Sequence, residues 1–155
     1  MAGVPGVDGV DGVRGGRFVT DSSVRRRVYG PGMAAKLGPV LVTGANSGIG
    51  LASVLRLAAR GWDTWGTVRS ASKADVLADA ARQAGVASSV HPVVLDVSDH
   101  DAVVERWPEL PGFHAVVNNA GYSELGAVEE VSAEQAKRQL DVNLIAPAVV
   151  ASCAL

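Results

Sequence analysis

The stretch Thr43-Gly44-Ala45-Asn46-Ser47-Gly48-Ile49-Gly50 decides the fold, because it joins an expected strand to an expected helix. Before it, Val40-Leu41-Val42 is a short apolar run that ends at a glycine turn, as a buried strand does. After it, Gly61 stands where a helix C-terminal glycine would. The apolar positions in between have helical spacing: Ile49, Leu51, Ala52, Leu55 and Ala59. We therefore predict a strand, a tight turn and a helix in direct succession.

The three glycines of this turn suit a diphosphate. Gly44 allows a tight exit from the strand, Gly48 lets backbone approach the diphosphate, and Gly50 lets the helix pack against the sheet. The helix N-terminus offers free N–H groups and the positive end of its dipole. An ordinary glycine turn is the alternative, but the position after the first strand favours a dinucleotide site. The candidate cofactor-binding residues here are Gly44, Asn46, Ser47, Gly48, Ile49 and Gly50.

The rest of the chain continues the alternation of strand and helix. We expect strands at 64–68, 90–95 and 113–117, and helices at 72–83 (capped by Ser72) and 100–106. A long helix is expected from Ser132 to the C-terminus, because Ser132-x-x-Gln135 is a capping-box pattern. This order predicts βαβ units, an α/β fold and a parallel sheet covered by helices.

Two further candidate sites follow expected strands, at the edge where such sheets bind ligands. Asp96 and Val97 follow the third strand, and the Asp96 carboxylate suits an adenine amine; a turn aspartate is the alternative. Asn118-Asn119-Ala120-Gly121 follows the fourth strand. Small residues there leave room for a ribose or nicotinamide, and Asn118 is expected to tie neighbouring strands together. The candidates at this second site are Asn118, Ala120 and Gly121.

These motifs, in this order, resemble the short-chain dehydrogenase/reductase family over roughly residues 38–155. The resemblance implies a Rossmann-type, doubly wound parallel sheet with strand order 3-2-1-4, and NAD or NADP as the ligand. It also implies hydride transfer between the nicotinamide and a carbonyl or alcohol carbon of a small-molecule substrate.

The end of the second expected strand points to NADP over NAD. An NAD site commonly has an acidic residue about 20 residues beyond the glycine turn. Here no carboxylate lies at 68–72, whereas Arg69 does. A guanidinium pairs with a 2′-phosphate, which a carboxylate would repel. A solvated surface arginine is the alternative, and we favour NADP.

The resemblance implies catalysis by an asparagine, a serine, a tyrosine and a lysine, and only Asn143 matches. Pro147 lacks the N–H that would pair with the Asn143 carbonyl, so this carbonyl could hold a water; a packing kink is the alternative. The tyrosines, Tyr29 and Tyr122, are not followed four residues later by lysine. We therefore expect the N-terminal, cofactor-binding half of a family member, truncated after about four strands and inactive alone. A non-catalytic dinucleotide-binding module and an inactive truncated product are the alternatives.

Composition limits the other classes of function. The 155 residues suggest one domain, and 14 basic against 16 acidic residues give no general attraction to nucleic acid or membranes. The single cysteine, Cys153, excludes an internal disulfide, and three scattered histidines make a metal site improbable. No apolar run reaches the roughly 18 residues that span a bilayer. We expect a cytoplasmic protein.

The two ends of the chain carry separate expectations. Residues 1–36 are rich in glycine and arginine and are expected to be a disordered extension, with Met33 as the natural start; residues 37–155 form the partial NAD(P)-binding domain. Leu144 to Leu155 is apolar nearly all round apart from Ser152. A helix of this kind suits burial against further strands or another subunit, and the second case would give a homo-oligomer through the C-terminal helix.

Overall fold

The computed structural model describes residues 37–155, so the predictions for residues 1–36, the start at Met33 included, lie outside the described residues. The strands are β1 (Leu37–Val42), β2 (Trp62–Val68), β3 (Val90–Val94) and β4 (Ala115–Val117). The α-helices are α1 (Gly48–Ala58), α2 (Ala71–Gln83), α3 (His100–Arg106), α4 (Ala133–Leu140) and α5 (Ala146–Ala154). A π-helical turn, Asp141–Ile145, joins α4 to α5, and short 3-10 turns lie at Ala87–Ser89 and Trp107–Glu109.

Within these residues the strands form one parallel sheet in the order β3-β2-β1-β4, as predicted. Val40 pairs with Thr64 of β2 and with Ala115 of β4, and Thr64 pairs with Val90 of β3. Helix α1 connects β1 to β2, and α2 connects β2 to β3. Neighbouring parallel strands need crossover connections of this kind. The α/β, doubly wound arrangement is therefore confirmed.

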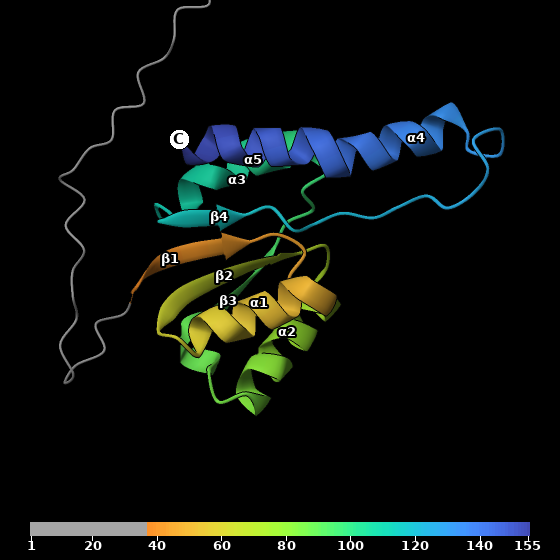
Figure 1. Ribbon diagram of the computed structural model, residues 1–155. Helices are drawn as coiled ribbons and strands as arrows, with labels where there is room; N and C mark the ends of the chain where they lie inside the picture. Colours follow the sequence, from red (N-terminus) through yellow and green to blue (C-terminus); the bar gives the residue numbers. More distant parts are fainter. Residues whose placement is uncertain (1–36) are drawn as a thin grey trace, which may run out of the picture. The chain divides into compact units, whose positions relative to one another are not determined.

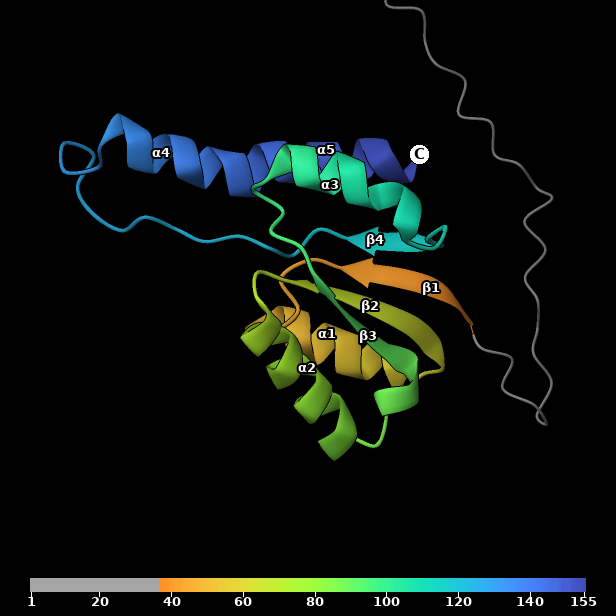
Figure 2. The same ribbon diagram turned by 180° about the vertical axis from the view of Figure 1, so that it is seen from behind.

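Helices cover both faces of the sheet (Figures 1 and 2). One apolar cluster packs α1 and α2 against one face and includes the fully buried Val42, Val54 and Leu77. The other packs α3 and α5 against the opposite face and includes Leu41, Val103 and Val150. The alternation of Leu41 and Val42 between the two clusters follows from the strand, whose successive side chains point to opposite faces. This burial on both faces explains why β1 is a continuous apolar run.

The apolar positions used to predict α1 are only partly on its buried side: Leu51 and Leu55 pack against the core. Gly50, Val54 and Ala58 are the buried residues, four apart along the helix, whereas Ile49 is 80% exposed and Ala52 and Ala59 are also exposed. Apolar residues occupy most positions of α1, so their spacing alone did not indicate which side of the helix is buried. The buried side of α1 packs mainly on β2, where Val54 lies next to Gly66.

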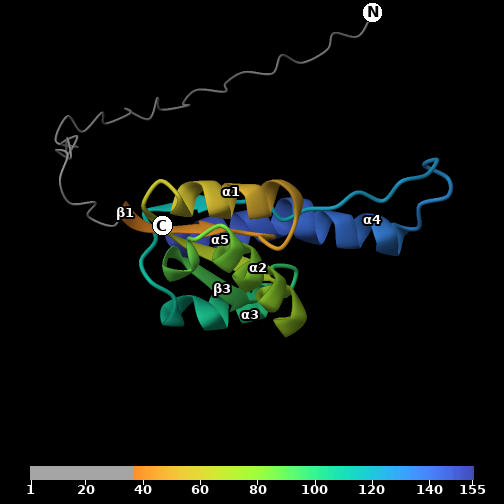
Figure 3. The same cartoon turned by 90° about the horizontal axis from the view of Figure 1, so that it is seen from below.

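Two helix boundaries also need correction. Ser70, not Ser72, is the N-cap of α2, because Ser70 still has an extended backbone (φ −154°) and the helix begins at Ala71. The predicted long C-terminal helix begins with the expected Ser132–Gln135 capping box but is interrupted by the π-turn. Seen from below, α4 runs out well beyond α1 and α2 (Figure 3). α4 contacts mainly the π-turn and not a strand.

Candidate functional site

The glycine turn adopts a conformation that other residues could not adopt without strain. Gly44 has φ +67°, and a Cβ there would lie 2.9 Å from the Ala120 Cα. A Cβ on Gly50 would collide with the Gly44 carbonyl oxygen and lie 2.5 Å from Asn119 Nδ2. Gly48 has φ +53°, and nothing lies within 4 Å of the position that a Cβ would take there. Gly44 and Gly50 are thus needed for close packing, and Gly48 for its left-handed backbone.

The backbone amides at the start of α1 are open. Among the described residues, none accepts a hydrogen bond from the N–H groups of residues 46–50, and the Ser47 side chain does not cap the helix. The first amide with a helical partner is that of Leu51, which donates to the Ser47 carbonyl (3.1 Å). Open amides and the positive helix end together attract an anion. The turn therefore fits a diphosphate, because no acceptor within residues 37–155 occupies its amides.

Hydrogen bonds to the end of β2 and to the segment after β4 hold this turn in place. Asn119 Nδ2 donates to the carbonyls of Thr43 (2.9 Å) and Gly44 (3.2 Å), and Thr43 Oγ1 accepts from the amides of Asn119 (3.0 Å) and Ala120 (2.9 Å). From the other side, the Ala45 amide donates to the Thr67 carbonyl (2.9 Å). The turn is thus clamped between the end of β2 and the segment after β4.

The residue that ties the strands is Asn119 and not the predicted Asn118. Asn118 Nδ2 donates instead to the Pro147 carbonyl (3.3 Å), and Asn118 does not line the cavity described below. Successive side chains of an extended segment point to opposite sides, so a shift of one residue moves the side chain to the other side.

A cavity of about 600 Å³ opens beside the turn, along the carboxyl edge of the sheet. All the predicted cofactor-binding residues line it except Gly48 and Asn118. The sequence interpretation missed nine further lining residues: Thr67, Val68, Leu95, Ser98, Asn119, Tyr122, Arg138, Asp141 and Val142. Several of these are neighbours in sequence of predicted residues at the ends of the strands. Their position at a strand end was therefore a signal that could have found them. Arg138 of α4 and Asp141 and Val142 of the π-turn had no such signal, because a long connection separates them from β4.

Arg69 and Asp96 both lie at this edge, but only the Asp96 side chain has hydrogen-bond partners among the described residues. Arg69 is exposed, lines the cavity and forms no ion pair within residues 37–155. Asp96 Oδ1 accepts from the Ser98 amide (3.0 Å) and from Ser98 Oγ (2.8 Å). Asp96 therefore shapes the turn after β3 and also lines the cavity. Its bonds go to one carboxylate oxygen, and the guanidinium of Arg69 is available to a ligand.

Asn143 holds the segment that follows Gly121. Its Oδ1 accepts from the Tyr122 amide (3.1 Å) and its Nδ2 donates to the Tyr122 carbonyl (2.7 Å). A Cβ on Gly121 would approach Asn143 Oδ1 to 3.1 Å, so glycine suits this close approach. Asn143 sits in the π-turn just before Pro147, whose missing N–H weakens regular α-helical bonding there. The side chain thus fixes Tyr122, which lines the cavity.

Other classes of site are absent from the described part of the chain. Residues 37–155 contain no cluster of three or more His, Cys, Asp or Glu side chains that could hold a metal ion. In the same residues, no helix is long and apolar enough to cross a membrane.

The chain is similar in sequence to known oxidoreductases. It is 34% identical over 107 residues to an uncharacterized oxidoreductase, YusZ, of Bacillus subtilis, a match that covers 67% of this chain and 38% of that protein. It is also 34% identical over 113 residues to the serine 3-dehydrogenase of Agrobacterium fabrum, with 69% and 43% covered. The chain thus spans less than half the length of these two relatives.

A solved structure and a family profile also match the chain. A short-chain dehydrogenase from Sphingobium yanoikuyae, solved in complex with NADPH, superposes with a TM-score of 0.66 at 32% identity, covering 76% of this chain and 47% of that chain. The family profile described as short chain dehydrogenase matches residues 39–155. Together with the glycine turn at the mouth of α1 and the β3-β2-β1-β4 sheet, this match shows that the chain belongs to the short-chain dehydrogenase family of oxidoreductases.

Proposed function

We propose that residues 37–155 form the cofactor-binding part of an NADP(H)-dependent oxidoreductase. The observation that carries this proposal is the row of open amides at the start of α1, beside a cavity of about 600 Å³. A diphosphate takes these amides, and the remaining nucleotide extends along the carboxyl edge of the sheet. The bound nicotinamide would supply or accept a hydride, and the protein would hold it against a carbonyl or alcohol substrate.

Arg69 supports NADP(H) over NAD(H). It lies at the end of β2, lines the cavity and has no carboxylate partner within the described residues. A guanidinium there pairs with the 2′-phosphate of NADP(H), whereas the acidic residue typical of NAD sites is missing from 68–72. The similar proteins of known structure include several solved in complex with NADPH.

Asn143 is the proposed catalytic residue. Its side chain is occupied by Tyr122, so the backbone carbonyl is the group left to act, through a bound water in a proton relay. The sequence contains no Tyr-x-x-x-Lys pair. A dinucleotide-binding module without turnover is therefore the second candidate function for the chain by itself.

Fluorescence titration tests the proposed function and separates these candidates. Trp65 lies on β2 two residues before Thr67 of the cavity wall, about 7 Å along the strand. Reduced nicotinamide absorbs where tryptophan emits, so bound NADPH should quench the protein fluorescence. We expect saturable quenching by NADPH and weaker binding of NADH. Turnover of a small ketone would contradict the non-catalytic alternative, and no quenching by either nucleotide would refute cofactor binding.

We also propose that the exposed side of the C-terminal helices joins two copies of the chain. Leu140 is 53% exposed and Leu144 is 60% exposed, and both lie where α4 meets the π-turn. Light scattering coupled to gel filtration should show a dimer, and Leu144→Glu should shift it toward a monomer. A monomeric parent protein at high concentration would refute this interface.

A further inference from the structure

The end of α4 and the π-turn after it border the cavity, and no motif in the sequence assigns this segment a function. Arg138 near the end of α4 lines the cavity, and so do Asp141 and Val142 in the π-turn that follows. Asp141 and Val142 come three and four residues after Arg138, a spacing that favours the same side of a helical segment. Arg138 and Arg69 are the two guanidinium groups among the lining residues. Arg69 comes from the end of β2, so Arg138 approaches the cavity from a separate element.

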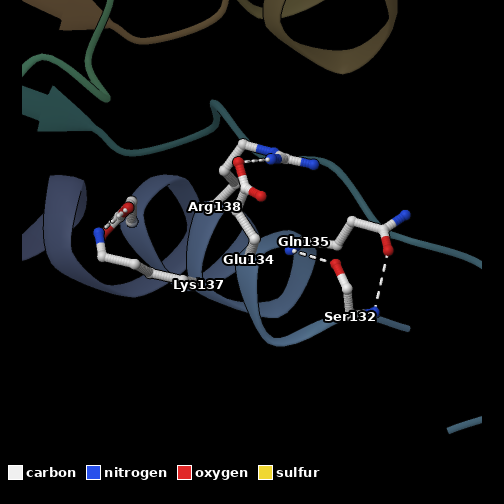
Figure 4. Close-up of polar contacts among 6 residues, drawn as sticks. Ser132, Glu134, Gln135, Lys137 and Arg138 are labelled. Atoms are coloured by element: carbon white, nitrogen blue, oxygen red, sulfur yellow. Dashed lines mark hydrogen bonds and ion pairs between the residues drawn. The ribbon is translucent and has the colours of Figure 1, made fainter. Parts of the chain in front are cut away.

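The side chain of Arg138 is held beside the cavity but is not locked. Its Nη1 donates to Glu134 Oε1 (2.9 Å), one helical turn earlier, as Figure 4 shows. The two side chains are 52% and 82% exposed, so the ion pair is solvated and weak. Glu134 does not line the cavity. The guanidinium can therefore leave Glu134 for a ligand at little cost, with its flat face and remaining donors available.

Both carboxylates that line the cavity have partners other than Arg138. Asp141 Oδ2 accepts from Lys137 Nζ (2.7 Å), and Asp96 Oδ1 is bonded to Ser98. Residues 96–98 after β3 line the cavity and provide the wall where adenine is expected. Arg138 lines the same cavity as this loop, and arginine stacks well on aromatic faces, so an adenine ring bound there is within the cavity that the guanidinium borders.

We propose that Arg138 covers the adenine ring of the bound dinucleotide, exchanging its contact with Glu134 for a stacking contact. This inference rests on the proposed binding of NADP(H) and adds a residue that recognises the adenosine end. Arg69 then discriminates the 2′-phosphate, whereas Arg138 recognises the part that NADPH, NADH and ADP-ribose share.

The test measures dissociation constants of the 155-residue chain for NADPH and NADH by fluorescence quenching, and for ADP-ribose by competition with NADPH. Arg138→Gln should weaken all three by about 5-fold. Arg138→Lys should behave like Arg138→Gln, because lysine keeps the charge but loses the flat face. Glu134→Gln should tighten binding by up to about 2-fold, and this gain should vanish in the double variant with Arg138→Gln.

Arg106→Gln is the matched control, because Arg106 also forms an exposed ion pair on a helix, with Glu109 (3.1 Å), but does not line the cavity. It should leave all three constants unchanged. Unaltered binding by Arg138→Gln would overturn the inference while leaving the proposed function intact. A loss confined to NADPH, or rescue by Arg138→Lys, would also overturn it, because either result indicates a phosphate contact. Failure of the unsubstituted chain to bind any of the ligands would overturn the proposed function and this inference together.

Discussion

Gly50→Ala has two opposing effects on the free energy of unfolding: a gain in helix propensity and a loss from overpacking. The structure predicts that the loss is larger. Alanine in place of glycine in an exposed helix interior stabilises by about 1 kcal/mol. At Gly50, however, a Cβ would strike the backbone oxygen of Gly44 and lie 2.5 Å from Asn119 Nδ2. The helix or the turn must move, which costs about 1–3 kcal/mol as overpacking. Displacing Asn119 also weakens its bonds to Thr43 and Gly44, each contributing about 1 kcal/mol.

Together these effects predict that Gly50→Ala lowers the free energy of unfolding by about 2–4 kcal/mol, after subtraction of the propensity gain. Urea denaturation followed by tryptophan fluorescence measures it, because Trp62, Trp65 and Trp107 all pack against the core clusters. Gly112→Ala is the control, since nothing lies within 4 Å of its Cβ position and its φ is not left-handed. It should change stability by less than about 1 kcal/mol. A Gly50→Ala variant as stable as the parent, with an unchanged m-value, would refute the packing argument.

Three further substitutions test the site and the core. Arg69→Gln should weaken NADPH by about tenfold, through loss of a charge-assisted bond, and leave NADH unchanged in the same quenching titration; an equal loss for both nucleotides would contradict a 2′-phosphate contact. Asn119→Ala should cost about 2 kcal/mol in urea denaturation, because two carbonyls of the turn lose their donor, and a change below that of Gly112→Ala would count against the clamp. Leu77→Ala removes a fully buried side chain and should cost about 2–5 kcal/mol, visible as a lower thermal midpoint, whereas a neutral outcome is incompatible with its burial.

The order of strands and helices could be predicted because apolar periodicity is a local property. The run at Val40 to Val42 and the turn that follows it have the expected structure. The helix at His100–Arg106 and the capping box at Ser132 also agree with the prediction. Each of these depends on residues close together in the chain, where spacing and capping chemistry act directly.

Predictions that depended on the rotation of a helix or on the direction of a side chain were less successful. The burial of Val54 and Ala58, and not Ala52 and Ala59, depends on how α1 lies on the sheet. The assignment of the strand tie to Asn118 failed by one residue, because the direction of a side chain after β4 depends on the register of β4 against β1. Neither the helix rotation nor the strand register is a local property of the sequence.

The site divides in the same way. The amino-acid order alone determined where the chain must turn with glycine, that the helix after this turn exposes its amides, and that Arg69 stands where an acidic residue would be expected for NAD. Only the tertiary structure decided that Arg138, Asp141 and Tyr122 line the same cavity as Gly44. Local geometry follows from neighbouring residues, whereas the meeting of distant side chains requires the tertiary fold to bring the end of α4 and the π-turn to the cavity at the carboxyl edge of the sheet. Non-local contacts of this kind carry no short-range signal.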